Sequence, residues 1–525
     1  MTRTNTILFS LIFFAVSIIV SLWSLFVYRN SILIFVLSIV FTFVILKKFS
    51  FKLPEISKSA IAISILVVFL ATYPYLFINS FVDASADPAS HISSLAIGET
   101  LPTNYGSFSS LEYRYQIGFP LFAKMFIDIT PFVSSNNVVW FLGALFTFFS
   151  AILIYLLSRE IFGGEKEGLI AIVLFIGSKI IFQNMYWGQY TFMLASVLFL
   201  ATFLAFYKKS PLAFLFFPAI IVVHPGVTFY ALIFFGLWFL VYKDFLRILK
   251  LFASGLIVLP VFFINYIQFI LNSGAEETIA FTFERLIENL SIFPFWIGVL
   301  IFVLAIMVLG LIVVKKVSNK MVLLFAVSFL VSGSMSILLS STGRILGGRI
   351  IELSMFSALF LSVFLIKYFL NLKPKFFVPV FAIILLISLG LFISSNQLEH
   401  LRNGSKITLE ETDFAYAFKE FDSEYKDTLF LIERHGKIAE VSQKIPFDVM
   451  SSWYLNYSSH FASNDPFYSE LLLRHELVEK IRNEHCVDCI TQAEFDYLVS
   501  KNDFFSTQLG LKKVFEYPPY MVFSK

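Results

Sequence analysis

Long apolar runs alternate with short polar gaps along this chain, and successive gaps differ in charge. Every second gap holds a cluster of Lys and Arg, such as Lys47 with Lys48 or Lys208 with Lys209, whereas the gaps between them hold acids and histidines. Short loops that stay in the cytoplasm retain Lys and Arg, and exported loops are depleted of them. The alternation predicts a multi-pass membrane protein with a cytoplasmic N-terminus.

The apolar runs have the length of membrane-spanning helices. A bilayer core takes about 20 residues of helix, and about thirteen runs meet this criterion. They are Ile7 to Val27, Ser31 to Leu46, Ala60 to Asn79, Val138 to Leu157, Leu169 to Phe182, Tyr190 to Tyr207, Pro211 to Val223, Val227 to Tyr242, Leu251 to Leu271, Ile292 to Val314, Met321 to Leu339, Ile350 to Phe369 and Phe376 to Ile393. A chain that begins in the cytoplasm and crosses the membrane an odd number of times continues on the exterior after its last crossing. We therefore expect a mainly α-helical membrane domain over residues 1–395 and an exported domain over 396–525.

Composition excludes an ordinary soluble protein, because 58% of the residues are hydrophobic and only 14% are charged. The net charge of +3 is explained by the cytoplasmic anchors. No basic face with interleaved aromatic residues occurs in a soluble segment, so membrane lipid is an expected partner and nucleic acid is not.

The exported domain has the pattern of a small α/β structure. The sequence predicts strands at Asp427 to Glu433 and His485 to Ile490, helices at Phe467 to Glu484 and Ala493 to Lys501, and a closing hairpin from Leu511.

The chain has two cysteines, Cys486 and Cys489, both in the second predicted strand. On a strand, positions i and i+3 point to opposite faces, which opposes a bridge and favours buried structural thiols. A disulfide in an oxidising exterior, or a zinc site that includes His485, stays an alternative.

Two pairs of short runs suggest helical hairpins that line a cavity open to the exterior. Their external turns are MYWGQ, with Trp187, Gln189 and Tyr190, and HPG, with His224. These side chains are candidates for hydrogen bonds to ligand hydroxyls and for ring stacking, and anchoring of the aromatic rings at the membrane surface is the alternative. The segment from Tyr115 to Pro131 is expected to be an interfacial or re-entrant helix on the same side.

The external segment over residues 80–135 begins with a large loop, Ser80 to Arg114, which carries the strongest chemical signal. Asp83 and Asp87 are four residues apart, Pro88 makes Asp87 a helix N-cap, and His91 follows one turn later. A carboxylate at this boundary can act as a general base toward a hydroxyl. On residue types alone, an equally open interpretation is that Asp87 only caps the helix. Glu112 and Arg114 end the loop and could return over the site.

Cations on the external side are rare. Arg344 and Arg349 flank a Gly-Gly pair at the external end of one span. They could clamp a phosphate in bidentate fashion, or alternatively reach the lipid surface or pair with Glu352. Lys179 lies within an apolar span, where an unpaired ammonium is costly, so it is a second candidate for phosphate contact.

The many helices, the acidic motif DPASH in the first large external loop, the short helices after it and the exported α/β domain together resemble the GT-C superfamily of integral-membrane glycosyltransferases. The resemblance covers the helical region. It implies a polyprenyl- or dolichyl-phosphate-linked sugar donor and a catalytic carboxylate that Asp87 matches best and Asp83 less well. The chain lacks the WWDYG-like signature of oligosaccharyltransferases and the adjacent Asp-Glu pair of protein O-mannosyltransferases, so no branch is assigned.

The expected reaction is sugar transfer to a hydroxyl of a glycan, lipid or protein acceptor on the extracytoplasmic side of the cell membrane. No nucleotide motif occurs in the cytoplasmic loops. A divalent cation held by Asp87 and a loop glutamate is compatible with this chemistry, although Arg and Lys alone can stabilise a leaving phosphate. A lipid-linked saccharide flippase or transporter and a non-catalytic cell-envelope assembly protein are the alternative functions.

Overall fold

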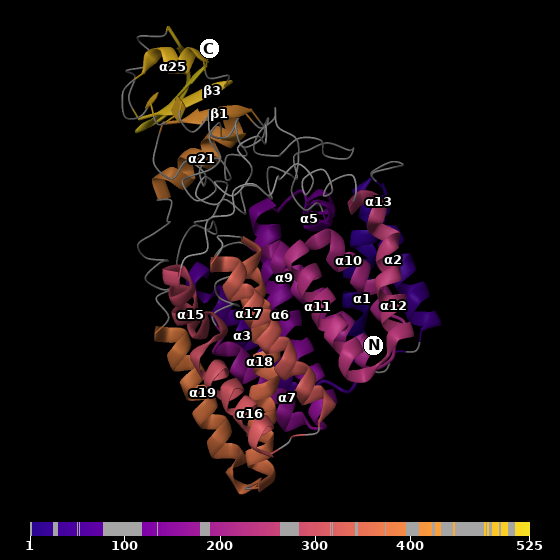
Figure 1. The fold of residues 1–525 in the computed structure, drawn as a ribbon. Coiled ribbons are helices and arrows are strands. Elements are labelled where there is room, and N and C mark those ends of the chain that lie inside the picture. Colours follow the sequence, from indigo (N-terminus) through magenta and orange to yellow (C-terminus); the bar gives the residue numbers. More distant parts are fainter. Residues whose placement is uncertain are drawn as a thin grey trace.

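The structure is a computed structural model. It describes residues 3–24, 30–49, 51, 53–76, 118–133, 135–178, 189–262, 283–315, 317, 319–341, 345–372, 374–394, 409–422, 426–431, 445–446, 477–478, 480–481, 486–492, 495–501 and 510–524. These residues form a helical bundle with a small α/β domain beyond one end (Figure 1). Helix α5 (Gly118–Ile129) lies at that end of the bundle, which we call the α5 end.

Every predicted apolar run contains helix. The helices are α1 (Arg3–Ser24), α2 (Ser31–Lys48), α3 (Lys58–Leu76), α6 (Ser135–Phe162), α7 (Glu165–Ile176), α9 (Tyr190–Tyr207), α10 (Ala213–Val223), α11 (Pro225–Tyr242), α12 (Phe245–Ser254), α13 (Leu259–Phe262), α15 (Phe283–Ile297), α16 (Val299–Lys315), α17 (Lys320–Ser341), α18 (Ile345–Leu372) and α19 (Phe377–Ser394). Short 3₁₀ turns, η1 (Gly255–Val258) and η3 (Pro374–Phe376), join some of them.

The described helices confirm a polytopic bundle but include fewer long spans than expected. Eight of them are long and apolar enough to cross a membrane, or nine if the bent pair α15 and α16 is one span. The count of about thirteen crossings is therefore higher than the described helices support on this criterion. Each predicted hairpin contains one short helix, α7 with 12 residues and α10 with 11. Their partners α9 and α11 each have 18 residues.

Aromatic packing holds the centre of the bundle together. Phe199 of α9 lies edge-on to Tyr230 of α11, with ring centroids 5.2 Å apart. Phe203, one turn further along α9, lies edge-on to Phe234 of α11 at 4.9 Å and to Phe360 of α18 at 6.1 Å. Such pairs add to the stabilisation that comes from area burial alone. These phenylalanines therefore pack between helices.

Hydroxyl groups link three helices inside the apolar bundle. Tyr230 Oη lies 3.0 Å from Ser357 Oγ of α18 and 3.5 Å from Ser328 Oγ of α17. Ser354 of α18 donates to Ser332 of α17 at 2.8 Å. Polar contacts of this kind join helices where lipid offers no hydrogen-bonding partner.

Basic residues from separate loops meet at the end of the bundle opposite α5. Lys208, after α9, lies 2.9 Å from Glu160 of α6, and Lys320 of α17 lies over the ring of Tyr242 of α11. Arg247 of α12 stacks on Phe206 of α9 at 3.8 Å from the ring centroid. Lys and Arg residues from three of the predicted cytoplasmic clusters thus lie at the same end of the bundle.

The C-terminal domain contains a five-stranded mixed sheet with the order β2-β1-β3-β5-β4. Its strands are β1 (Asp427–Phe430), β2 (Ile445–Pro446), β3 (Tyr497–Ser500), β4 (Lys512–Tyr517) and β5 (Tyr520–Ser524). Strand β1 pairs in parallel with β2 and β3, whereas β5 is antiparallel to β3 and β4.

Apolar residues cover both faces of this sheet, which is typical of parallel strands. Phe414 and Phe418 of α21 (Leu409–Phe421) pack on one face with Val499 and Val522. Val478 and Ile481 pack on the other face with Leu429, Leu498 and Phe523. The structure therefore confirms an α/β domain.

One polar cluster ties α21 to this sheet. Tyr497 of β3 donates a hydrogen bond of 2.6 Å to Asp422, just after α21, and Lys426 lies 3.0 Å from the same carboxylate oxygen. Burial, together with the hydrogen bond to Asp422, raises the pKa of Tyr497. The phenol is therefore a neutral donor throughout the physiological pH range.

Two predicted elements of this domain are wrong. The segment predicted as a strand from His485 to Ile490 contains the start of helix α25 (Val487–Gln492), and the segment predicted as a helix from Ala493 to Lys501 contains β3. The predicted strand at Asp427 and the closing hairpin are confirmed as β1 and as β4 with β5.

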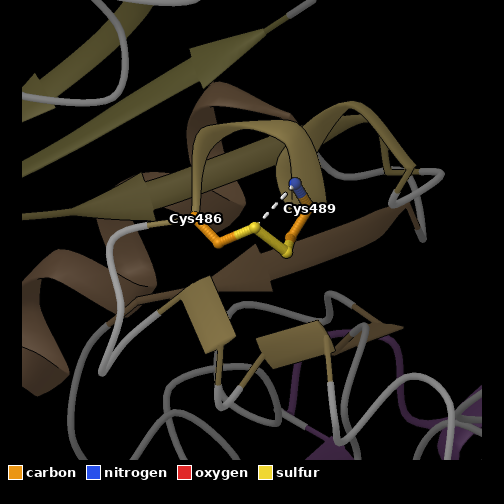
Figure 2. The surroundings of a disulfide bond; sticks show 2 residues. All are labelled: Cys486 and Cys489. Atoms are coloured by element: carbon orange, nitrogen blue, oxygen red, sulfur yellow. Dashed lines mark hydrogen bonds between the residues drawn. A yellow bond between two sulfur atoms is a disulfide. The ribbon is translucent and has the colours of Figure 1, made fainter.

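The cysteine prediction is also wrong, because Cys486 and Cys489 form a disulfide (Figure 2). The argument against a bridge assumed a strand. At the start of a helix, positions i and i+3 lie on the same face, so the two sulfurs can meet.

Candidate functional site

The HPG turn between α10 and α11 is built by local hydrogen bonds. His224 is extended (φ −156°, ψ 118°), and its Nδ1 accepts the backbone N–H of Val227 at 3.3 Å. Pro225 occupies the first position of α11, where no backbone donor is needed. Since Nδ1 is the acceptor, the proton of a neutral ring resides on Nε2.

The start of α9 holds the second predicted tip. Gln189 precedes the helix and is 4% exposed, and Tyr190 is 3% exposed. Among the residues that the structure describes, no donor reaches Gln189 Oε1. A buried amide oxygen without a partner costs about 1–3 kcal/mol, so this oxygen is a candidate acceptor for a ligand hydroxyl.

The two tips and helix α5 contact one another. Phe192 of α9 lies edge-on to the His224 ring at 5.4 Å, and Phe119 of α5 lies 6.0 Å from the ring of Tyr190. The backbone of Gly118, where α5 begins, approaches the end of α10 so closely that a Cβ would lie 2.6 Å from Val222 O. The structure therefore brings together the HPG turn, the start of α9 and the end of the first loop.

Gly118 permits this close approach, so Gly118→Ala is expected to push α5 away from α10. Overpacking of this kind costs about 1–3 kcal/mol of the free energy of unfolding, and a lower melting temperature in detergent measures it. Gly310→Ala is the matched control, because a Cβ on that glycine of α16 has no neighbour within 4 Å. Equal melting temperatures for the two variants would contradict the proposed contact.

The register between α9 and α18 places the backbone of Arg349. The pairs Phe199–Phe356 and Phe203–Phe360 keep one sequence offset, 157, so the two helices run in the same direction. The same offset puts Arg349 level with Phe192, about 10 Å further toward the α5 end than Phe199. Arg349, the fifth residue of α18, thus lies at about the level of His224.

Glu352 follows Arg349 by one turn of α18 and is 2% exposed. A carboxyl group buried within an apolar bundle is costly and is often functional. Its sequence signal is a single acid inside an apolar span, which predicts no more than a partner for the arginines. Phe119, Phe192 and Tyr230 were not singled out at all, because aromatic residues in spans are usually packing residues.

Other predicted site residues lie outside the described residues. They are Asp83, Asp87, His91, Glu112, Arg114, Lys179, Trp187 and Arg344, together with the side chain of Arg349. The described residues contain no group of three or more His, Cys, Asp or Glu side chains that could hold a metal ion. The cation ligands considered above, Asp87 and a loop glutamate, stay a prediction.

No protein-family model matches the sequence, and no curated protein shows significant similarity to it. Among solved structures, the chain is similar to the Archaeoglobus fulgidus oligosaccharyltransferase, which was solved as a complex with Zn and sulfate. The TM-score is 0.47 at 13% identity, and the match covers 83% of this chain and 67% of the other.

Proposed function

We propose that this protein is a membrane glycosyltransferase that transfers a sugar from a polyprenyl- or dolichyl-phosphate-linked donor to an acceptor hydroxyl on the extracytoplasmic side. One observation carries the proposal. Gln189, Tyr190, His224 and the backbone of Arg349 share one level of the bundle, beside the helix into which the first external loop leads. These candidates for hydroxyl and phosphate contact come from three separate segments of the chain, and their common level supports a shared site.

Chain connectivity supports a role for the first loop at this place. Arg114 is four residues before Gly118, so its Cα lies within about 14 Å of that glycine whatever path the chain takes. Glu112 is within about 22 Å by the same limit. The acidic segment with Asp83, Asp87 and His91 belongs to the same loop.

Two features support an extracytoplasmic location of the α5 end. The basic residues gather at the opposite end, as the orientation rule requires of the cytoplasmic side. The C-terminal domain, which lies beyond the α5 end, contains a disulfide, and disulfides persist in oxidising compartments.

The proposed reaction is a displacement at the anomeric carbon. The Asp87 carboxylate accepts the proton of the acceptor hydroxyl, whose oxygen forms the new bond to that carbon. The bond from the carbon to the phosphate oxygen breaks, and the lipid phosphate leaves with its negative charge toward Arg344, Arg349 or Lys179. In this proposal, Gln189 Oε1 accepts a hydrogen bond from a sugar hydroxyl, and Tyr190 and Trp187 are candidates for stacking on the sugar ring.

Reconstitution tests this function. We expect proteoliposomes supplied with lipid-linked sugars extracted from the source membrane, and with a hydroxyl acceptor, to convert the donor to free lipid phosphate. Mass spectrometry of the lipid fraction measures this conversion. Movement of intact donor across the bilayer without its consumption would instead identify a flippase, and an unchanged donor would indicate a non-catalytic protein.

A further inference from the structure

The disulfide between Cys486 and Cys489 has features of a chemically active pair. Only two residues separate the cysteines, so the bridge closes a very short loop. By the chain-entropy relation, a bridge that closes a four-residue loop stabilises the folded state less than half as much as one that closes a loop of about 100 residues. The bridge lies within one local segment and joins no distant elements, so stabilisation alone explains it poorly.

The two sulfurs also have different surroundings. Cys489 is 6% exposed and packs in the apolar cluster with Ile490, Phe495 and Leu498. Cys486 is half-buried at the edge of the same cluster, so an incoming thiolate can approach it more readily. Attack at the more accessible sulfur would make Cys489 the leaving group.

A backbone donor is already directed at the accessible sulfur. The N–H of Cys489 donates to Cys486 Sγ at 3.2 Å, the contact drawn in Figure 2. A hydrogen bond to the charged form of a group favours that form, so this N–H would stabilise a Cys486 thiolate once the bridge is open. The backbone thus prepares Cys486 to leave from a mixed disulfide.

From these features we propose that the Cys486–Cys489 pair is a thiol–disulfide exchange site that oxidises the dithiol of a partner polypeptide. One thiolate of the partner attacks Cys486 Sγ, the bond to Cys489 breaks, and the Cys489 thiolate takes up a proton. The second partner thiolate then attacks the partner sulfur of the mixed disulfide and releases Cys486. Two electrons pass from the partner dithiol to the pair, and the partner becomes a disulfide. This activity is independent of sugar transfer.

Dithiothreitol, itself a dithiol, is the probe for the first test. The full-length protein in detergent micelles is incubated with it under native conditions, blocked with N-ethylmaleimide and digested for mass spectrometry. We expect both cysteines to be labelled while the circular dichroism signal and the melting transition of the domain persist. Labelling that needs prior unfolding with denaturant would identify a purely structural bridge and overturn the proposal.

Variants test the assigned roles of the two sulfurs. With glutathione disulfide as the probe, Cys489→Ser is expected to form a mixed disulfide at Cys486 at least about tenfold faster than Cys486→Ser does at Cys489. Equal or reversed rates would overturn the assignment. If a variant fails to fold, limiting iodoacetamide on the reduced wild-type protein gives the same comparison, since Cys486 should be alkylated first.

Discussion

Replacement of Asp87 by Asn is expected to lower the rate of sugar transfer by about 10²- to 10⁴-fold, the range that a positioned general base contributes. The Asn side chain cannot take up the proton of the attacking hydroxyl group. It retains the shape of Asp and the capacity to cap a helix. Expression and melting temperature should therefore stay close to those of the wild type. Turnover of donor to lipid phosphate in proteoliposomes measures the effect.

Asp128 is the matched control for Asp87, whereas Asp83 is the second candidate for the same catalytic role. Asp128 of α5 is partly exposed and lies 3.2 Å from Lys124, so Asp128→Asn should leave transfer unchanged and cost at most about 1 kcal/mol of stability. Asp83→Asn should have a smaller effect than Asp87→Asn, because Asp83 matches the acidic motif less well. Full transfer by the Asp87→Asn variant would remove this residue from the catalytic assignment.

Arg349→Ala is expected to lower kcat/KM for the lipid-linked donor by about 10- to 150-fold. This range corresponds to the loss of one charge-assisted hydrogen bond, about 1.5–3 kcal/mol. Much of the effect should appear in KM, since a phosphate contact is made in the bound donor as well as during its departure. Titration of the lipid-linked donor at saturating acceptor separates the two constants.

Arg349→Lys discriminates between a phosphate contact and a structural role for this arginine. A lysine retains the charge but not the planar pair of donors, so it should recover part of the lost donor affinity. If the Arg349→Ala and Arg349→Lys variants both have the wild-type KM for the donor, Arg349 does not bind the phosphate. If both variants lose melting temperature in parallel with activity, Arg349 instead stabilises the start of α18, for instance through Glu352.

The sequence predicted the helical part well because its signals are strong and local. An apolar run of about 20 residues has few alternatives to a membrane helix. Pro225 and the neighbouring glycine marked the turn at His224, and the structure confirms it. The clusters of Lys and Arg likewise predicted which loops meet at one end of the bundle.

Prediction failed where short windows had to decide between helix and strand. The segments around Cys486 and Tyr497 are each a few residues long, and periodicity cannot separate the two states over such a length. Pairing with β1 and β5 makes the segment around Tyr497 a strand. The helix after Cys486 instead packs Ile490 in the apolar cluster. As a direct consequence, the sequence favoured buried thiols over the disulfide, which it kept only as an alternative.

By itself, the sequence determined that the chain is a polytopic helical protein with an α/β domain, because hydrophobic length and charge bias are properties of single segments. It also named Gln189, Tyr190, His224 and Arg349 as candidates. Only the tertiary structure decided that they share one level beside α5, and that Cys486 and Cys489 are bridged. Both outcomes depend on helix register and on contacts between segments far apart in the chain, which no local pattern encodes.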